Sequence, residues 1–526
     1  MNTVIGIDFG TQSARALLAD AADGSVLEAA SVRYAQGILP GDLVAIDDYD
    51  KALRQLLQTV ARPEYRSTIR GICIDATSLT LVCLSTDGTP IEKLPGFESR
   101  EQAKAKLWKR HAAEQQAQEA LRLAQAMKMP FLRRTGGSIS SEWTLPKLLE
   151  IRDKDPEVYR QIDLAFDLCE YLTYRLTGQI VRSMGSMCYK ALWAQDLGFP
   201  SSAYLDALRP GFARKYTHLL RGPVCVPGEK AGFLQAEWCE AFGLSSDVAV
   251  AVGLLDGHAA QAALGALHAG DAVLAAGTSN VLSIQTEKLL EIPGICGAAM
   301  NGQIPGLCGL DTGQSCTGDM LDWYTKNMLP GGIAQEAARK GIDVHTLLAD
   351  RVQKPWECPL TIADWWNGSR NAPCDLLLRG FIQGVSMDTR PEDIYLGLLQ
   401  SIVCGTREIA QVCADSGGRI RRFFAAGGMA RKNPLLMQQY ADILHIPIQV
   451  GNTQEGPALG AALFAAAAAG IYPNLRESWQ MMGVKAFTVY QPDTEHFLQY
   501  EQIYQRNHRI RTVLAAMRKD EANGNQ

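Results

Sequence analysis

Residues 5–15 combine a carboxylate, a glycine turn and hydroxyls at a spacing that suits a nucleotide phosphate and its metal. An apolar strand ends in Asp8, a Gly-Thr turn follows, and a second apolar run begins at Arg15. Backbone N–H groups at a glycine turn can face anionic oxygens, and a carboxylate at a strand end can hold hydrated Mg²⁺. We therefore expect a metal at Asp8. An ordinary β-hairpin with Asp and Gly as turn residues is the alternative.

A second Gly-Thr turn repeats this plan without the aspartate. Gly277-Thr278 follows the apolar run Ala272–Ala276 and leads into another β-compatible stretch. Two such turns can hold one triphosphate, which predicts a duplicated fold with a nucleotide between its halves. Gly427-Gly428 ends another expected strand, where glycines let the backbone approach a flat ligand such as adenine. A tight strand–helix turn that needs no ligand is the alternative there, and neither G-x-G-x-x-G nor a Walker pattern occurs.

Asp256 is the candidate general base. It follows Gly253-Leu-Leu and precedes a glycine and several alanines, which fits a carboxylate at the start of a helix. A helix N-cap role explains the same residue equally well. His258 is a rival base, although residues i and i+2 do not share a helix face. An ordinary aspartate, with a pKa of about 4, is a weak base for an alcohol, so early deprotonation of a substrate hydroxyl is not expected.

The composition is that of an ordinary globular protein. The chain has 526 residues, 47% apolar and 20% charged, with a net charge of −5, so we expect two to four domains and no nucleic-acid partner. Its 13 cysteines form no CxxC pair, which favours reduced thiols in the cytoplasm. The first residues enter a strand at once, without a signal-peptide pattern. The 15-residue run Ala458–Tyr472 is too short to span a membrane and predicts a buried helix.

Strand and helix patterns alternate along the chain, which predicts an α/β fold. The join between two halves is expected near Gly265–Gly270, and residues 519–526 are expected to form a frayed tail. Strands are expected at Val4–Asp8, Ala14–Ala19, Val26–Tyr34, Ile69–Asp75, Asp271–Ala276, Val281–Gln285, Arg422–Ala426 and Ile446–Val450. Helices are expected at Tyr49–Val60, Glu101–Met127, Thr144–Arg152, Leu164–Leu176, Gly397–Gly417 and Asn433–Leu444.

Taken together, these segments resemble the FGGY carbohydrate kinases, most of all the ribulokinases and related pentulose kinases. The resemblance covers nearly the whole chain. It departs from the family pattern at Gly397, where Ala or Ser is usual, and at Glu150, where Trp is usual. The segments that carry it are Ile5–Arg15, Gly137–Trp143, Gly309–Ser315 with Gly318-Asp319, Asp364–Arg370, Gly380–Val385 with Asp393, Ile394 and Gln400, and Gly427–Asn433.

The resemblance implies two ribonuclease-H-like domains of the actin and Hsp70 ATPase superfamily around a central cleft, spanning residues 1–265 and 266–526. It assigns Asp8 to Mg²⁺ and Asp256 to the catalytic base. The nucleotide would contact Gly10, Thr11, Ser13, Arg15, Gly277, Thr278, Gly318, Gly427, Gly428 and Asn433. The sugar would contact Asp75, Glu142, Lys190, Asp256 and Asp311.

The activity implied is phosphorylation of a ketopentose at its terminal hydroxyl by ATP with Mg²⁺, with ribulose the first choice. Asp311 stands where bacterial L-ribulokinases tend to have Glu, and Asp75–Leu79 is more similar to the D-ribulose kinase branch. Kinases for xylulose or erythritol are near alternatives. A non-catalytic ATP switch of the actin or Hsp70 kind, or a sugar sensor, is the more distant one. The family also implies a homodimer, and no membrane partner is expected.

Overall fold

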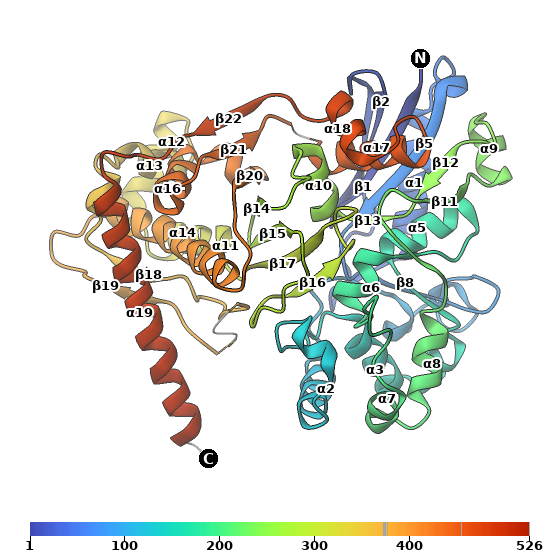
Figure 1. Cartoon of the computed structure of the whole chain (residues 1–526), viewed down its shortest axis with the longest axis horizontal. Coiled ribbons are helices and arrows are strands. Elements are labelled where there is room, and N and C mark those ends of the chain that lie inside the picture. Colours follow the sequence, from blue (N-terminus) through green and yellow to red (C-terminus); the bar gives the residue numbers. More distant parts are fainter. Residues whose placement is uncertain (372–374, 376, 454, 525–526) are drawn as a thin grey trace.

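Two large mixed sheets, one in each half of the chain, organise the protein (Figure 1). The structure is a computed structural model that describes residues 1–371, 375, 377–453 and 455–524. The first sheet has the order β11-β12-β5-β1-β2-β3, with β13 beside β5. It contains β1 (Thr3–Phe9), β2 (Ser13–Asp20), β3 (Val26–Arg33), β5 (Ile69–Ala76), β11 (Lys230–Phe233), β12 (Ala249–Ala251) and β13 (Leu254–Leu255).

The second sheet repeats the pairing of the first. Its order is β16-β17-β15-β14-β20-β21-β22. In both sheets a central strand pairs antiparallel with the strand after it and parallel with a later one, β1 with β5 and β14 with β20. This equivalence confirms the predicted duplication. The strands are β14 (Asp271–Ala276), β15 (Asn280–Thr286), β16 (Gly297–Met300), β17 (Cys308–Gln314), β20 (Arg422–Ala426), β21 (Ile448–Gly451) and β22 (Phe487–Tyr490).

Helices cover both sheets, and small sheets complete each half. In the first half these are α1 (Ile46–Val60), α2 (Glu114–Ala126), α3 (Thr144–Lys154), α4 (Pro156–Gln161), α5 (Leu168–Thr177), α6 (Met184–Lys190), α7 (Ser202–Leu208), α8 (Phe212–Leu219), α9 (Ala236–Phe242) and α10 (Asp256–Leu264), with β4 (Leu43–Val44), β6 (Leu81–Leu84), β7 (Ala105–Lys106), β8 (Leu164–Asp167), β9 (Arg182–Ser183) and β10 (Val224–Cys225). In the second half they are α11 (Gly318–Asn327), α12 (Gly331–Lys340), α13 (Val344–Arg351), α14 (Pro391–Asp415), α15 (Gly428–Lys432), α16 (Pro434–Leu444), α17 (Gly456–Ala468), α18 (Leu475–Met482) and α19 (Phe497–Gly524), with β18 (Thr361–Ala363) and β19 (Phe381–Gln383).

The helix α17 comes from the second half but packs on the first sheet. Its alanines share one buried cluster with Val4, Leu17 and Cys73 of β1, β2 and β5, and it also packs along α10. The approach is backbone to backbone, since a Cβ added at Gly6 would lie 1.8 Å from the carbonyl oxygen of Ala458. The predicted buried helix is therefore confirmed, and its small residues are what allow this close contact.

The opposite face of the first sheet packs on α1. Ile5, Ile7 and Phe9 share a buried cluster with the apolar face of that helix, which includes Tyr49 and Leu53. The alternation of side chains along a strand sends these residues to the α1 side and Val4 to the α17 side. Because both faces of β1 are covered, its end is held firmly, and that end carries Asp8.

Three of the predicted segments differ in the structure. Of the expected Glu101–Met127 helix only α2 is α-helical. Residues 101–113 contain a single 3-10 turn at Glu101–Ala103 and the strand β7, where Lys106 is buried, and buried Arg110 binds Glu150 and Glu101. Residues 164–167 form β8, paired with β6, and α5 starts after a capping box at Asp167. The expected frayed tail is helical through Gly524, and residues 525–526 lie outside the described part. None of the described helices is both long and apolar enough to cross a membrane.

Candidate active site

The first glycine turn joins β1 to β2 at the end of the first sheet. The Gly10 N–H donates to the carbonyl of Ser13 at 3.0 Å, which closes the turn. Arg15 Nη1 lies 3.2 Å from Asp8 Oδ2, so the guanidinium and the carboxylate form an ion pair beside the turn. Trp108 Nε1 donates to the Thr11 hydroxyl at 3.2 Å. The predicted set around Asp8 is therefore gathered at one strand end.

A second carboxylate lies beside Asp8. The parallel pairing of β1 with β5 places Asp75 opposite Asp8, and Asp75 is fully buried. Among the described residues neither of its carboxylate oxygens has a hydrogen-bond partner. Burial and the neighbouring carboxylates Asp8 and Asp256 raise the pKa of Asp75 well above its usual value. Two adjacent buried acids are costly to ionise together, which is a common property of ligand sites.

Asp256 joins the same group from α10. β13 pairs with β5 at Asp75, and Asp256 follows β13 directly as the first residue of the helix. Its Oδ1 accepts from the N–H of Gly257 at 2.8 Å, while the N-cap position falls on Leu255. Burial, reinforced by the Asp8 carboxylate, raises the pKa of Asp256 to about 7. The carboxylate is thus a stronger base than an ordinary aspartate.

His258, the rival base, is enclosed. Its ring lies edge-on to Tyr189 with 5.3 Å between the ring centroids, and burial lowers its pKa to about 4. The imidazole is therefore neutral near pH 7. The Tyr189 hydroxyl in turn donates to the carbonyl of Gly309 in the second half at 2.8 Å.

The second glycine turn joins β14 to β15 and is one residue shorter than the first. Strand pairing stops at Phe9 and Ala14 around the first turn but at Ala276 and Asn280 around the second. The N–H of Gly318 donates to the carbonyl of Gly277 at 3.1 Å, and a Cβ at Gly318 would lie 2.6 Å from that oxygen. The start of α11 is thus held tightly against the turn.

The Gly427-Gly428 pair lies against the same turn. The parallel pairing of β14 with β20 ends at Ala275 and Ala426, so the pair follows directly beyond it. Gly427 has φ of +98°, and a Cβ there would lie 2.4 Å from the carbonyl oxygen of Ala276. The structure therefore brings four of the glycines predicted to bind the nucleotide together at one end of the second sheet: Gly277, Gly318, Gly427 and Gly428.

Asn433 has a structural role in the same region. Its Oδ1 caps α16 by accepting from the N–H of Leu436, and its Nδ2 donates to the Tyr395 hydroxyl at 2.9 Å. Its assignment to the nucleotide stays a prediction.

The residues expected on the sugar side come from both halves. Lys190 at the end of α6 lies 3.2 Å from Asp311 in β17, and both are largely buried. Burial alone would lower the pKa of Lys190, but Asp311, together with Cys296 and Glu142, raises it overall. Lys190 also lowers the pKa of Asp256, which opposes the larger effect of burial. The Lys190–Asp311 ion pair and the carboxylates Asp8, Asp75 and Asp256 therefore interact electrostatically with one another through Asp256.

Glu142 lies between the side chains of His111 and Arg370, which the sequence did not connect to it. Its Oε1 is 3.7 Å from His111 Nε2 and 3.6 Å from Arg370 Nη2, and the residue is 8% exposed. Arg370 ends Asp364–Arg370, one of the segments that carry the family resemblance, whereas nothing in the sequence pointed to His111 or Trp108.

Comparison with known protein families decides the identity of this fold and site. The N-terminal domain of the FGGY family of carbohydrate kinases matches residues 3–265, and its C-terminal domain matches residues 272–469. The chain belongs to the FGGY family of carbohydrate kinases. It is therefore a carbohydrate kinase by family, as the sequence indicated, and the two matches account for the two equivalent sheets.

Individual relatives of this FGGY kinase agree with the match. A protein named ribulokinase from Mycolicibacterium smegmatis is 38% identical over 519 residues, covering 95% of this chain and 92% of the relative. A ribulokinase from Shouchella clausii (strain KSM-K16) is 35% identical over 522 residues, covering 95% and 93%. The crystal structure of a xylulose kinase from Rhodospirillum rubrum has a TM-score of 0.82 at 22% identity, covering 98% of this chain and 99% of that one, which shows the shared fold.

Proposed function

We propose that this FGGY kinase transfers the γ-phosphoryl group of ATP to the terminal hydroxyl of a ketopentose, with ribulose the preferred sugar. The position of Asp256 carries the proposal. It is a partly buried carboxylate that interacts electrostatically with both Asp8 and Lys190. A base with a pKa of about 7 suits proton transfer at neutral pH. The names of the relatives, ribulokinase, favour a ketopentose over other sugars.

In this proposal each group has one task. Asp256 orients the sugar hydroxyl and takes its proton as the bond from oxygen to the γ-phosphorus forms. The bond from that phosphorus to the oxygen of ADP breaks at the same time. Phosphoryl transfer needs mainly positioning and charge neutralisation. Arg15 and the N–H groups of the two turns other than those of Gly10 and Gly277, which donate within the turns, supply these for the phosphates.

Asp8 and Asp75 fit a hydrated Mg²⁺. Two adjacent buried carboxylates, one with both oxygens free of hydrogen bonds among the described residues, are oxygen donors of the kind this ion prefers. No group of three or more His, Cys, Asp or Glu side chains that could hold a metal occurs in the described ranges. Proteins usually hold Mg²⁺ through one or two carboxylates together with waters and phosphates. When bound, the ion would neutralise charge on the phosphates. In this proposal Asp75 therefore helps to bind the metal, in addition to the sugar contact predicted for it.

The test is ADP release with ATP and Mg²⁺ over a panel of L-ribulose, D-ribulose, xylulose and erythritol. We expect sugar-dependent turnover that is highest with one form of ribulose. Asp256→Ala should lose about 10²-fold or more in turnover, on the scale of general-base contributions, while ATP binding persists. Asp322→Ala, at an exposed site on α11, is the matched control. ATP hydrolysis at the same rate with and without any sugar would favour an ATP switch instead.

A further inference from the structure

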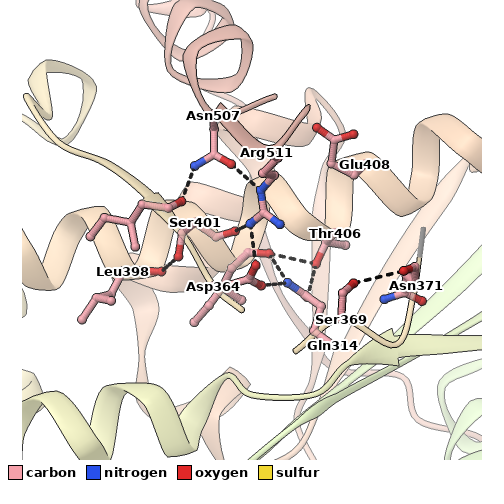
Figure 2. Close-up of polar contacts among 12 residues, drawn as sticks. Gln314, Asp364, Ser369, Asn371, Leu398, Ser401, Thr406, Glu408, Asn507 and Arg511 are labelled. Carbon is pink, nitrogen blue, oxygen red and sulfur yellow. Dashed lines mark hydrogen bonds and ion pairs between the residues drawn. The ribbon is translucent and has the colours of Figure 1, made fainter. Parts of the chain in front are cut away.

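The segment from Asp364 to Arg370 is anchored on a buried ion pair with the C-terminal helix. Asp364 accepts hydrogen bonds from Arg511 Nη2 of α19 and from Gln314 Nε2 of β17, each at 2.6 Å (Figure 2). The exposed fractions of the two ionic side chains are only 8% and 4%. A Cβ at Gly405 would lie 2.5 Å from Gln314 Nε2, so α14 also fits closely against this anchor.

The far end of the segment is fixed to the strand that carries Asp311. Asn371 contacts the Thr312 hydroxyl and the carbonyl of Gly313 in β17. The Ser369 hydroxyl donates to the carbonyl of Asn371 at 3.0 Å, which stiffens the turn (Figure 2). Arg370 lies between these two residues, so its backbone is held at both ends.

From this fixed position Arg370 reaches the other half of the chain. Its Nη2 lies 3.6 Å from Glu142 Oε1, an oxygen that has no hydrogen-bond partner among the described residues. His111 approaches the same oxygen from the first half at 3.7 Å. The second half thus supplies a guanidinium that forms an ion pair with this Glu142 oxygen across the two halves, without a hydrogen bond to it.

We propose that Arg370 is a positioning residue for Glu142 in sugar recognition, held in place by the Asp364–Arg511 anchor. This inference rests on the proposed function, since it requires that Glu142 meet the sugar. A carboxylate held by a guanidinium presents its remaining lone pairs in a fixed direction to sugar hydroxyls. The sugar site then needs residues from both halves. The helix α19 contributes indirectly, because its Arg511 anchors the segment that carries Arg370.

A double-mutant cycle between Arg370→Gln and Glu142→Gln tests the proposal. Each single variant should raise the sugar KM about tenfold, within the two- to hundredfold range of coupled neighbours, and leave the ATP KM unchanged. The double variant should be no worse than the worse single variant, because Arg370 acts through Glu142. Arg370→Lys should recover part of the loss. Arg339→Gln, at an exposed arginine of α12, is the control.

Sugar binding without ATP, measured by calorimetry, separates this role from a general loss of fold. The Arg370→Gln variant should bind sugar about tenfold more weakly and keep the melting temperature of the wild type. The proposal would be overturned if the rise in sugar KM in the double variant equalled the product of the rises in the two single variants. An equal rise in the ATP KM would also overturn it. If the wild type phosphorylates no sugar of the panel, the proposed function fails. If the wild type is active but the cycle shows no coupling, only this inference fails.

Discussion

The buried ion pair between Asp364 and Arg511 should be essential to the stability of the second half. Asp364→Asn keeps the side-chain shape but leaves the Arg511 guanidinium buried without its counter-charge. Breaking one partner of such a pair typically costs about 3–5 kcal/mol. The exposed pair of Lys326 with Asp322, whose side chains are 72% and 55% exposed, is of the kind worth only about 0.2–0.5 kcal/mol. The two pairs therefore differ by roughly tenfold in expected effect.

Thermal unfolding, followed by tryptophan fluorescence, measures this difference. For a domain of 150–250 residues, 1 kcal/mol shifts the melting temperature by about 2–4 °C, so Asp364→Asn should lower it by roughly 6–20 °C. Asp322→Asn should change it by no more than about 2 °C. Replacing both partners, with Asp364→Leu and Arg511→Met, should recover most of the loss, since removing both charges leaves none unpaired. A single variant as stable as the wild type, or a double variant worse than the single, would refute the reasoning.

Three further changes have definite expected outcomes. In steady-state kinetics, Asp311→Ala should raise the KM for the sugar much more than the KM for ATP. A change in the ATP KM alone would contradict the assignment of Asp311 to the sugar. Gly6→Ala would place a Cβ 1.8 Å from the carbonyl oxygen of Ala458, so it should destabilise the protein by about 1–3 kcal/mol or more in urea titrations. Gly331→Ala, where a Cβ meets nothing within 4 Å, should not. The pKa of His258 is about 4 in the folded protein and about 6.5 in the unfolded chain. Because the unfolded chain takes up this proton first, the free energy of unfolding is unaffected above pH 6.5 and falls as the pH drops toward 4, by up to about 1.4 kcal/mol per pH unit. The melting temperature of the wild type should therefore fall more between pH 7 and pH 5 than that of His258→Gln, and parallel curves would contradict this.

Local patterns predicted the parts of the site that local sequence determines. The turn at Gly10 and the helix start at Asp256 follow from a strand pattern interrupted by glycine or followed by small residues. The pairing of Asp75 with Asp8 depends on the register between strands far apart in the chain, which no local pattern specifies. Arg370 and Glu142 are likewise joined only by the fold.

The failed helix prediction has a similar cause. The spacing of charges and alanines in residues 101–127 is typical of a helix, but Arg110 also pairs with the fully buried Glu150, which lies outside that window. A buried guanidinium takes the geometry its carboxylate requires, and this overrides the local preference. The family resemblance supplied what local patterns could not, because it assigned Lys190 and Asp311 to the same site, and the structure pairs these two side chains.

The packing of α17 on the first sheet has a consequence for how the chain folds during synthesis. Val4, Leu17 and Cys73 are covered by a helix that begins only at Gly456, after residues 266–455 have been made. At about 5–20 residues per second, that interval lasts roughly 10–40 s. Until α17 arrives, one apolar face of the first sheet remains exposed to water and to other chains, and a chaperone that binds apolar surface would find it there. The half of the protein that is synthesised first is thus completed late.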